Sequence, residues 1–148
     1  MKHLSHSPAQ TMKFAHNFAS RLKGGDIVAL SGNLGTGKTQ FVKGVANFFK
    51  IKKNITSPTF VLIKVYHVKK NHLKPSKGSQ FKLVHIDCYR LSSPRELLDI
   101  GLQELLDSPR NIILIEWAEK IKNILPKKTF WIKFSYGKKI NERLIKLK

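Results

Sequence analysis

The chain has 148 residues, of which 41% are hydrophobic and 25% charged, and this size and balance predict one soluble globular domain over residues 1–148. No apolar run approaches the ~20 residues of a membrane span, and residues 1–8 lack the apolar segment of a signal peptide. Cys88 is the only cysteine, which excludes an internal disulfide and a cysteine-cluster metal site. These features predict a cytoplasmic protein with no membrane partner.

Lysines account for most of the formal net charge of +19, because 23 of the 28 basic residues are lysines. Lysine and arginine neutralise the phosphates of nucleic acids, so one interpretation is a nucleic-acid partner. The other is the codon bias of an AT-rich genome, which agrees with the even spread of lysines along the chain. The charge alone therefore does not identify a nucleic-acid-binding protein.

The first predicted element is a helix. Residues 7–10 (Ser-Pro-Ala-Gln) place serine at the N-cap, proline in the first turn and glutamine three residues after the serine, which is the pattern of a capping box. Apolar residues recur at helical spacing as far as Leu22, and Gly24-Gly25 predicts the end of the helix. We expect this helix to pack on a sheet.

A short buried strand, residues 27–30, leads into the sequence Gly-Asn-Leu-Gly-Thr-Gly-Lys-Thr at residues 32–39. These eight residues match the G-x-x-x-x-G-K-[ST] phosphate loop in full. The glycines allow positive φ angles, so backbone N–H groups can point at a phosphate. A helix to about Lys50 follows, which places the positive end of its dipole under the anion.

The phosphate loop predicts binding of a nucleoside triphosphate. Lys38 is expected to contact the β- and γ-phosphates, and the Thr39 hydroxyl is expected to bind Mg²⁺. The remaining nucleotide-binding positions of the loop are Asn33, Leu34, Gly35, Thr36 and Gly37.

Two strands are predicted next, at residues 60–68 and 81–86, and they are expected to pair antiparallel. The basic segment 69–80 between them predicts an exposed hairpin loop or an insertion. A second capping box at residues 93–96 predicts a helix closed by Pro109. The apolar face of this helix is expected to comprise Leu98, Gly101, Leu102 and Leu105.

The last part of the chain predicts a strand, a short helix and a hairpin. Residues 111–115 form a continuous apolar run, as expected for a strand covered on both faces. A helix from about 118 to 124 follows, and residues 129–134 and 143–147 bracket a turn as a C-terminal β-hairpin. The order of elements predicts a three-layer α/β domain of the P-loop NTPase class with a mixed central sheet.

Two of the apolar strands end in acids, Asp87 and Glu116. Open α/β sheets bind ligands at strand ends, so both acids are candidates for the magnesium site. Asp87 is expected to hold Mg²⁺ directly or through water, and Glu116 to do the same or to orient the attacking water. Residues 56–59 (Thr-Ser-Pro-Thr) lie where switch loops sense the γ-phosphate, although such clusters are also common in plain turns. Trp117 is either a nucleotide contact or an ordinary anchor of the fold.

Four motifs occur in a fixed order: residues 32–39, Thr-Ser-Pro-Thr-Phe at 56–60, His-Ile-Asp-Cys-Tyr-Arg-Leu at 85–91, and Ile-Glu-Trp-Ala-Glu at 115–119. Together they resemble the TsaE (YjeE-type) P-loop ATPases of bacterial tRNA threonylcarbamoyladenosine (t6A) biosynthesis. The resemblance extends from about residue 7 to the end of the chain. The combination is much more specific than the phosphate loop alone.

The resemblance implies a cytoplasmic, Mg²⁺-dependent ATPase that converts ATP to ADP and phosphate. It serves the modification of tRNA adenosine 37 without transferring the threonylcarbamoyl group, and it supports turnover of its partners, the TsaD and TsaB proteins. The basic segment 69–80 is longer than expected for the family, and it is a candidate contact with partners or, weakly or indirectly, with tRNA.

The resemblance also implies residue roles. The catalytic residues are Lys38, Asp87 and Glu116, and the metal ligands are Thr39, Asp87 and Glu116. The nucleotide-binding residues are those of 33–39 together with Thr59 and Trp117. Tyr89 and Arg90 match motif positions to which no individual role is assigned.

Other functions fit the sequence less well. A nucleotide or metabolite kinase needs an acceptor-binding region and an arginine-rich lid, whereas the 32 residues after Glu116 contain one arginine, Arg143. A GTPase needs an Asn-Lys-x-Asp segment, which is missing, and a basic RNA-binding module leaves the phosphate loop and both acids unexplained. The six histidines lack metal-site spacing. No arginine is placed by the sequence to complete the site, which predicts slow hydrolysis raised by partners.

Overall fold

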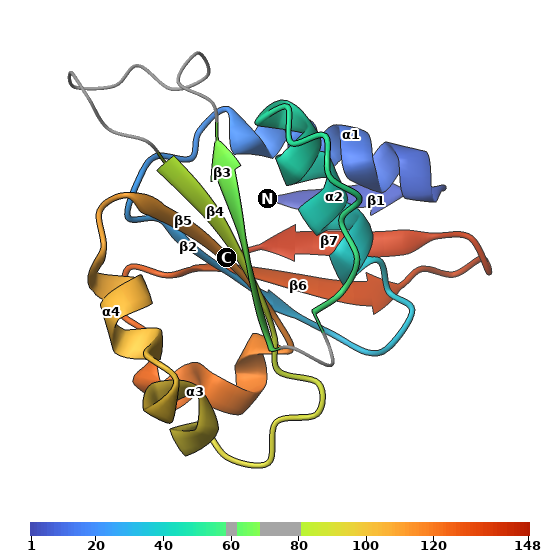
Figure 1. Cartoon of the computed structure of the whole chain (residues 1–148). Coiled ribbons are helices and arrows are strands. Elements are labelled where there is room, and N and C mark those ends of the chain that lie inside the picture. Colours follow the sequence, from blue (N-terminus) through green and yellow to red (C-terminus); the bar gives the residue numbers. More distant parts are fainter. Residues whose placement is uncertain (59–61, 69–80) are drawn as a thin grey trace.

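A mixed β-sheet forms the centre of the computed structural model, which describes residues 1–58, 62–68 and 81–148 (Figure 1). In chain order the strands are β1 (Lys2–Ser5), β2 (Ile27–Ser31), β3 (Ile63–Val68), β4 (Phe81–Asp87), β5 (Asn111–Glu116), β6 (Phe130–Tyr136) and β7 (Arg143–Leu147). The helices are α1 (Pro8–Ala19), α2 (Lys38–Phe48), α3 (Arg95–Asp99), α4 (Leu102–Asp107) and the 3₁₀ helix η1 (Ala118–Ile124).

Parallel strands occupy the middle of the sheet, whose order is β1-β7-β6-β2-β5-β4-β3. Strand β2 pairs in parallel with β6 and β5, and β5 pairs in parallel with β4. The outer pairs, β1–β7, β6–β7 and β3–β4, are antiparallel. The predicted mixed sheet and C-terminal hairpin are therefore confirmed.

Helices cover both faces of this sheet, α1 and α2 on one side and α3, α4 and η1 on the other (Figure 1). The side chains of β2 point alternately to the two faces of the sheet, and so contribute to both cores. Val28 and Leu30 pack in the core beneath α1 and α2, whereas Ile27 and Ala29 pack in the core beneath the other helices. Strand β5 is buried along its whole length, as expected for a strand covered on both faces. This arrangement is the predicted three-layer α/β domain.

The start of α1 has the serine half of the predicted capping box, whereas the glutamine bonds the residue before the N-cap and not the N-cap itself. Ser7 Oγ accepts a hydrogen bond from the backbone N–H of Gln10 (3.2 Å), and Gln10 Oε1 accepts one from the backbone N–H of His6 (2.8 Å). Strand β1, directly before the helix, was not predicted. It is a short edge strand in which only Ser5 is fully buried, so its sequence has no period-two apolar pattern.

The predicted end of this helix at Gly24-Gly25 is wrong, because α1 ends at Ala19. The next residues form tight three-residue turns, in which the N–H groups of Arg21 and Leu22 bond the carbonyls of Phe18 and Ala19. Leu22 remains buried although it lies outside the helix, which is why the apolar pattern continued past the true end.

The single helix predicted after residues 93–96 is also wrong. The chain forms two short helices, α3 and α4, separated by Gly101 at a φ of +91°. A left-handed residue interrupts the helical hydrogen-bond ladder and reorients the second helix. The buried leucines are consequently Leu97, Leu102 and Leu106, while Leu98 of the predicted face is exposed.

The strand predicted from residue 60 begins at Ile63, because Leu62 has a left-handed backbone at φ +63°. Thr59, Phe60 and the basic segment 69–80 lie outside the described residues. Strand β4 and the antiparallel β3–β4 pairing agree with the prediction. Within the residues that the structure describes, no helix is both long and apolar enough to cross a membrane.

Helices α1 and α2 approach each other closely at Gly44. A Cβ atom at this position would lie 2.3 Å from the carbonyl oxygen of Met12 and 2.6 Å from the Cβ of Ala15. Both neighbours are rigid parts of α1, so they cannot move aside without displacing the helix. The close approach matters for the site because α2 begins with the phosphate-loop lysine.

We expect Gly44→Ala to destabilise the protein by about 1–3 kcal/mol, because overpacking outweighs the helix propensity that alanine adds. Urea unfolding followed by circular dichroism measures this change. The matched control is Asn47→Ala on the exposed side of α2, which is expected to change stability by no more than about 0.5 kcal/mol. A Gly44→Ala variant as stable as the wild type would contradict the close approach.

Candidate nucleotide-binding site

The phosphate loop and both predicted acids meet at one edge of the sheet. The loop follows β2, Asp87 ends β4 and Glu116 ends β5. In the β4–β5 register Asp87 lies directly opposite Glu116, and in the β2–β5 register Leu30 lies opposite Glu116. The carboxyl ends of adjacent parallel strands therefore bring both acids beside the loop, as the sequence predicted.

The loop is shaped by its glycines. Gly32 has a φ of +134°, and a Cβ there would lie 2.2 Å from the carbonyl oxygen of Phe134 on β6, so no other residue fits. Thr36 is buried, and its hydroxyl donates a hydrogen bond to the carbonyl of Asn33 (2.7 Å). This bond within the loop stabilises its tight turn. Gly37 is the N-cap of α2 and makes no side-chain cap, which leaves first-turn N–H groups to face an anion.

Lys38 is held over this loop. Its ammonium donates to the carbonyl oxygens of Gly32 (2.6 Å) and Asn33 (2.9 Å), and it lies 3.9 Å from the centre of the Trp117 ring. Burial lowers the pKa of Lys38, and the negative charge of Glu116 partly offsets this effect. The lysine thus provides a positive charge at the mouth of the loop, between the loop backbone and an aromatic face.

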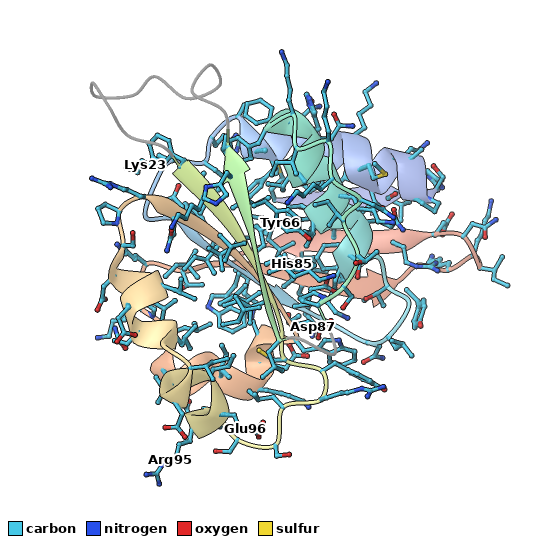
Figure 2. The ribbon with its side chains drawn as sticks, viewed as in Figure 1. Lys23, Tyr66, His85, Asp87, Arg95 and Glu96 are labelled. Carbon is cyan, nitrogen blue, oxygen red and sulfur yellow. The ribbon has the colours of Figure 1, made fainter. Side chains whose placement is uncertain are left out.

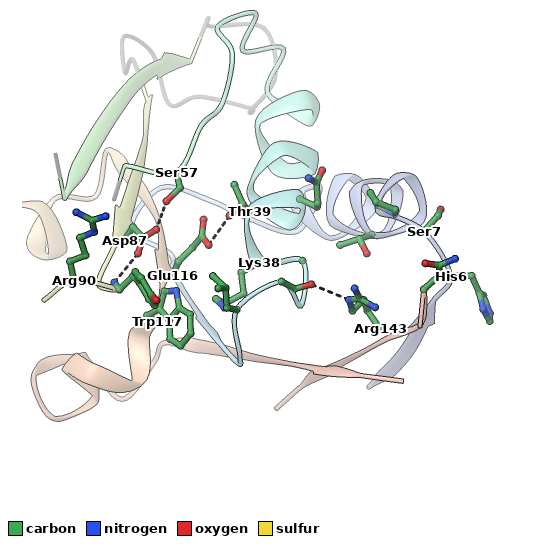
Figure 3. A pocket seen from close by; sticks show the side chains of 18 residues that line it. His6, Ser7, Lys38, Thr39, Ser57, Asp87, Arg90, Glu116, Trp117 and Arg143 are labelled. Carbon is green, nitrogen blue, oxygen red and sulfur yellow. Dashed lines mark hydrogen bonds between the residues drawn. The ribbon is translucent and has the colours of Figure 1, made fainter. Parts of the chain in front are cut away.

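Glu116 is buried and accepts hydrogen bonds at both carboxylate oxygens. Thr39 Oγ1 donates to Oε2 (2.9 Å), and His85 Nε2 lies 2.8 Å from Oε1. Asp87, also buried, accepts one hydrogen bond from the Ser57 hydroxyl and another from the backbone N–H of Tyr89 (2.8 Å). Figure 3 shows the contacts of Asp87 and the contact between Thr39 and Glu116 on the acidic side of the site.

A magnesium ion fits this donor set. The described residues contain no cluster of three histidine, cysteine or acidic side chains of the kind that holds a metal in an all-protein cage. Two carboxylates and a hydroxyl beside a phosphate loop are instead typical of Mg²⁺, which binds few protein ligands together with water and substrate phosphates. Thr39, Asp87 and Glu116 are the residues that could hold it.

The cavity at this edge has a volume of about 770 Å³ and extends to both sides of the loop (Figure 3). The acidic side includes Ser57, Asp87, Tyr89, Arg90, Glu116 and Trp117. The opposite side is formed by the chain before and within α1 and by the C-terminal hairpin, through His6, Ser7, Pro8, Thr11, Asn141 and Arg143. A cavity open on both sides of a phosphate loop has room for an extended nucleotide.

The C-terminal hairpin contacts the loop directly. Arg143 Nε donates to the carbonyl of Gly35 (3.2 Å), the Tyr136 hydroxyl donates to the carbonyl of Leu34, and the Arg143 guanidinium lies 5.0 Å from the Tyr136 ring centre. No motif in the sequence places these residues at the site. Their arrival depends on β6 pairing with β2, and no local pattern specifies that pairing.

The structure also shows where the remaining predicted site residues lie. Asn33, Gly35 and Gly37 belong to the loop as expected, and Leu34, whose side chain is exposed, is among the residues that line the cavity. Trp117 has a left-handed backbone at φ +57°, and its ring lies 5.0 Å from that of Tyr89 as well as near Lys38. Sequence reasoning also missed His85, whose signal is its place two residues before Asp87 on the same face of β4.

Comparison with known proteins gives a consistent result. The family model described as "Threonylcarbamoyl adenosine biosynthesis protein TsaE" matches residues 5–145. Three relatives carry the name tRNA threonylcarbamoyladenosine biosynthesis protein TsaE. The protein of Rickettsia prowazekii (strain Madrid E) is 42% identical, over 83% of this chain and 78% of its own length. That of Treponema pallidum (strain Nichols) is 37% identical over 89% of both chains, and that of Bacillus subtilis (strain 168) is 35% identical over 85% and 72%.

A solved structure agrees with the fold. The crystal structure of Bacillus subtilis YdiB superposes with a TM-score of 0.77 at 28% sequence identity, covering 99% of this chain and 83% of that one.

Cys88 follows Asp87 and is fully buried. Its burial and, to a smaller extent, the negative charge of Asp87 raise the pKa of its thiol to about 12. The reactive thiolate is therefore scarce at pH 8, and we expect the folded protein to react with a thiol reagent at least ~10²-fold more slowly than the protein in urea. The readout is specific because the chain has one cysteine. Equal rates in the two states would show that the turn after β4 is open to solvent.

Proposed function

Because the chain belongs to the TsaE family of t6A biosynthesis proteins, we propose that it is the ATP-hydrolysing component of this tRNA modification machinery. The observation that carries the proposal is the meeting of Thr39, Asp87 and Glu116 at the mouth of a complete phosphate loop. A loop without the acids would support binding alone. Two carboxylates beside it support hydrolysis as well.

The residues of the site have distinct roles in this proposal. The backbone N–H groups of 32–39 bind the phosphates, and Lys38 neutralises the charge that develops on them. Thr39, Asp87 and Glu116 hold Mg²⁺, which when bound supplies further positive charge to the phosphoryl group. Glu116 also accepts a hydrogen bond from the water that attacks the γ-phosphorus and so orients it.

The two sides of the cavity support one direction for the bound nucleotide in this proposal. The γ-phosphate belongs on the side of Asp87 and Glu116, so the nucleoside extends towards the start of α1 and Arg143 (Figure 3). Adenine is favoured because the chain lacks a guanine-reading segment. Trp117 covers Lys38 and limits the access of bulk water to the charged groups.

The proposal includes slow hydrolysis in the absence of partners, and the way Arg143 is held supports it; Arg90 also lines the acidic side of the cavity and has no role in the proposal. The Nη1 of Arg143 donates to the carbonyls of Ile140 (2.8 Å) and Glu142 (2.9 Å), and its Nε donates to the loop. These bonds fix the guanidinium on backbone oxygens at the nucleoside side, away from the charge that develops at the γ-phosphate. The TsaD and TsaB proteins are the proposed cytoplasmic partners, whose turnover this ATPase supports.

Phosphate release tests the proposal directly. We expect slow release by the protein alone and faster release when the TsaD–TsaB pair is added, whereas Lys38→Ala lowers kcat/KM by about 10²-fold or more in both conditions. Lys43→Ala on α2 is the matched control, since Lys43 lies outside the cavity and its loss is expected to leave the rate unchanged.

Two outcomes would contradict the proposal. Equal rates of phosphate release with and without the TsaD–TsaB pair would contradict activation by partners. A Lys38→Ala variant that hydrolyses ATP at the wild-type rate would contradict the assignment of the site. Phosphate transfer to an added metabolite, without an effect of the pair, would instead identify a kinase.

Arg143→Ala tests the contact between the hairpin and the loop. The variant loses a charged hydrogen bond to the Gly35 carbonyl, so we expect affinity for a non-hydrolysable ATP analogue to fall by about 10-fold. Arg95→Ala is the control, because Arg95 is exposed on α3 far from the cavity (Figure 2). Isothermal titration calorimetry measures both affinities, and an unchanged affinity for Arg143→Ala would show that the hairpin does not support the loop.

A further inference from the structure

His85 is a completely buried histidine beneath the acidic side of the site, and the proposed mechanism leaves it without a role. Its Nε2 lies 2.8 Å from Glu116 Oε1, while its Nδ1 has no hydrogen-bond partner among the described residues. A polar ring buried with one unpaired nitrogen costs stability, so its presence needs an explanation.

The sheet register explains how the ring reaches Glu116. His85 pairs with Leu114 and Asp87 pairs with Glu116, so His85 and Glu116 are diagonal neighbours on adjacent strands. His85 and Asp87 share a face of β4 because side chains alternate along a strand, and Figure 2 shows them following one another towards the end of β4. This is the face covered by α1 and α2, on which the phosphate loop also lies.

The donor and acceptor roles follow from the chemistry of the two groups. A carboxylate only accepts hydrogen bonds, so Nε2 carries the hydrogen and donates it to Glu116 Oε1. The other carboxylate oxygen, Oε2, then points to the Thr39 hydroxyl at 2.9 Å. His85 and Thr39 thus fix both oxygens of Glu116, one from below the site and one from within it.

The unpaired Nδ1 excludes a second role. A histidine that relays protons receives one at one nitrogen and releases another from the opposite nitrogen to a partner. No side chain or backbone group in the described part of the chain is placed to exchange a proton with Nδ1. The ring is therefore suited to hold Glu116 in place, and not to conduct protons away from it.

We propose that His85 is a positioning residue, which fixes the rotamer of Glu116 so that Oε2 faces Thr39 and the γ-phosphate side of the cavity. This inference rests on the proposed ATPase function and adds to it the source of the orientation of Glu116. Groups that orient a ligating or water-binding carboxylate commonly contribute 10–100-fold to activity.

The first test separates positioning from stability. His85→Leu removes the donor, and we expect its kcat for ATP hydrolysis to fall about 10–100-fold while KM for ATP stays within about threefold. His85→Gln retains an N–H donor of similar reach, and we expect it to recover most of the lost rate. Leu83→Ala is the matched control on the same face of β4. It lowers the melting temperature and leaves kcat unchanged.

The second test needs neither nucleotide nor metal. In protein labelled with ¹⁵N-histidine, the ring signals of His85 are assigned by their absence in His85→Gln. We expect a hydrogen on Nε2, and we expect its signal to shift in Glu116→Ala, where the acceptor is missing. A hydrogen on Nδ1 alone, or a signal unaffected by Glu116→Ala, would overturn the inference.

The kinetic outcomes distinguish this inference from the proposed function. If His85→Leu hydrolysed ATP at the same rate as the wild type, the proposed role of His85 would be overturned, while the proposed ATPase function would stand. A loss of rate in His85→Leu that His85→Gln does not relieve, with a melting temperature as low as that of Leu83→Ala, would assign a purely structural role. A wild-type protein that does not hydrolyse ATP, with or without its partners, would overturn the proposed function first.

Discussion

Two buried carboxylates, Asp87 and Glu116, lie opposite each other at the ends of β4 and β5. Several neighbouring groups stabilise this pair by donating hydrogen bonds to it. Like charges in adjacent register positions repel, and each buried carboxylate requires hydrogen-bond donors. Asp87 receives them from Ser57 and the turn after β4, and Glu116 from Thr39 and His85. Helix α2, the loop before β3, and strands β4 and β5 are thereby joined at one point. A cation bound there would relieve the same repulsion, which is why the arrangement suits a magnesium nucleotide.

The phosphate loop is held from a second direction by the C-terminal hairpin. Tyr136 and Arg143 bond loop carbonyls, while Lys38 bonds two others from within, so much of the loop backbone is satisfied by contacts that leave its N–H groups to a phosphate. Preorganised N–H donors cost little reorganisation when an anion binds. The close approach of α1 and α2 at Gly44 sets the position of α2, and with it the position of Lys38 and Thr39. Packing far from the chemistry therefore determines the geometry of the loop.

Local sequence predicted the elements wherever one physical signal dominated. The apolar run of β5, the N-cap serine of α1 and the glycines of the phosphate loop each specify a conformation through their own chemistry, and the structure agrees. Predictions were wrong where a neighbour decided the outcome. Gly101, with a left-handed backbone, separates α3 from α4, and β1 pairs only with β7 at the edge of the sheet. Neither feature changes the apolar periodicity of the sequence.

The candidate site shows the same division. The phosphate loop and the acid at the end of each of two apolar strands could be predicted from the residues alone, because glycine geometry and strand termini are local properties. The folded arrangement was needed to show that Asp87 lies opposite Glu116, that His85 contacts Glu116, and that Tyr136 and Arg143 reach the loop. These contacts depend on the order of strands in the sheet and on their register. Strand order and register are set by the burial of both faces at once, which no single segment of the chain specifies.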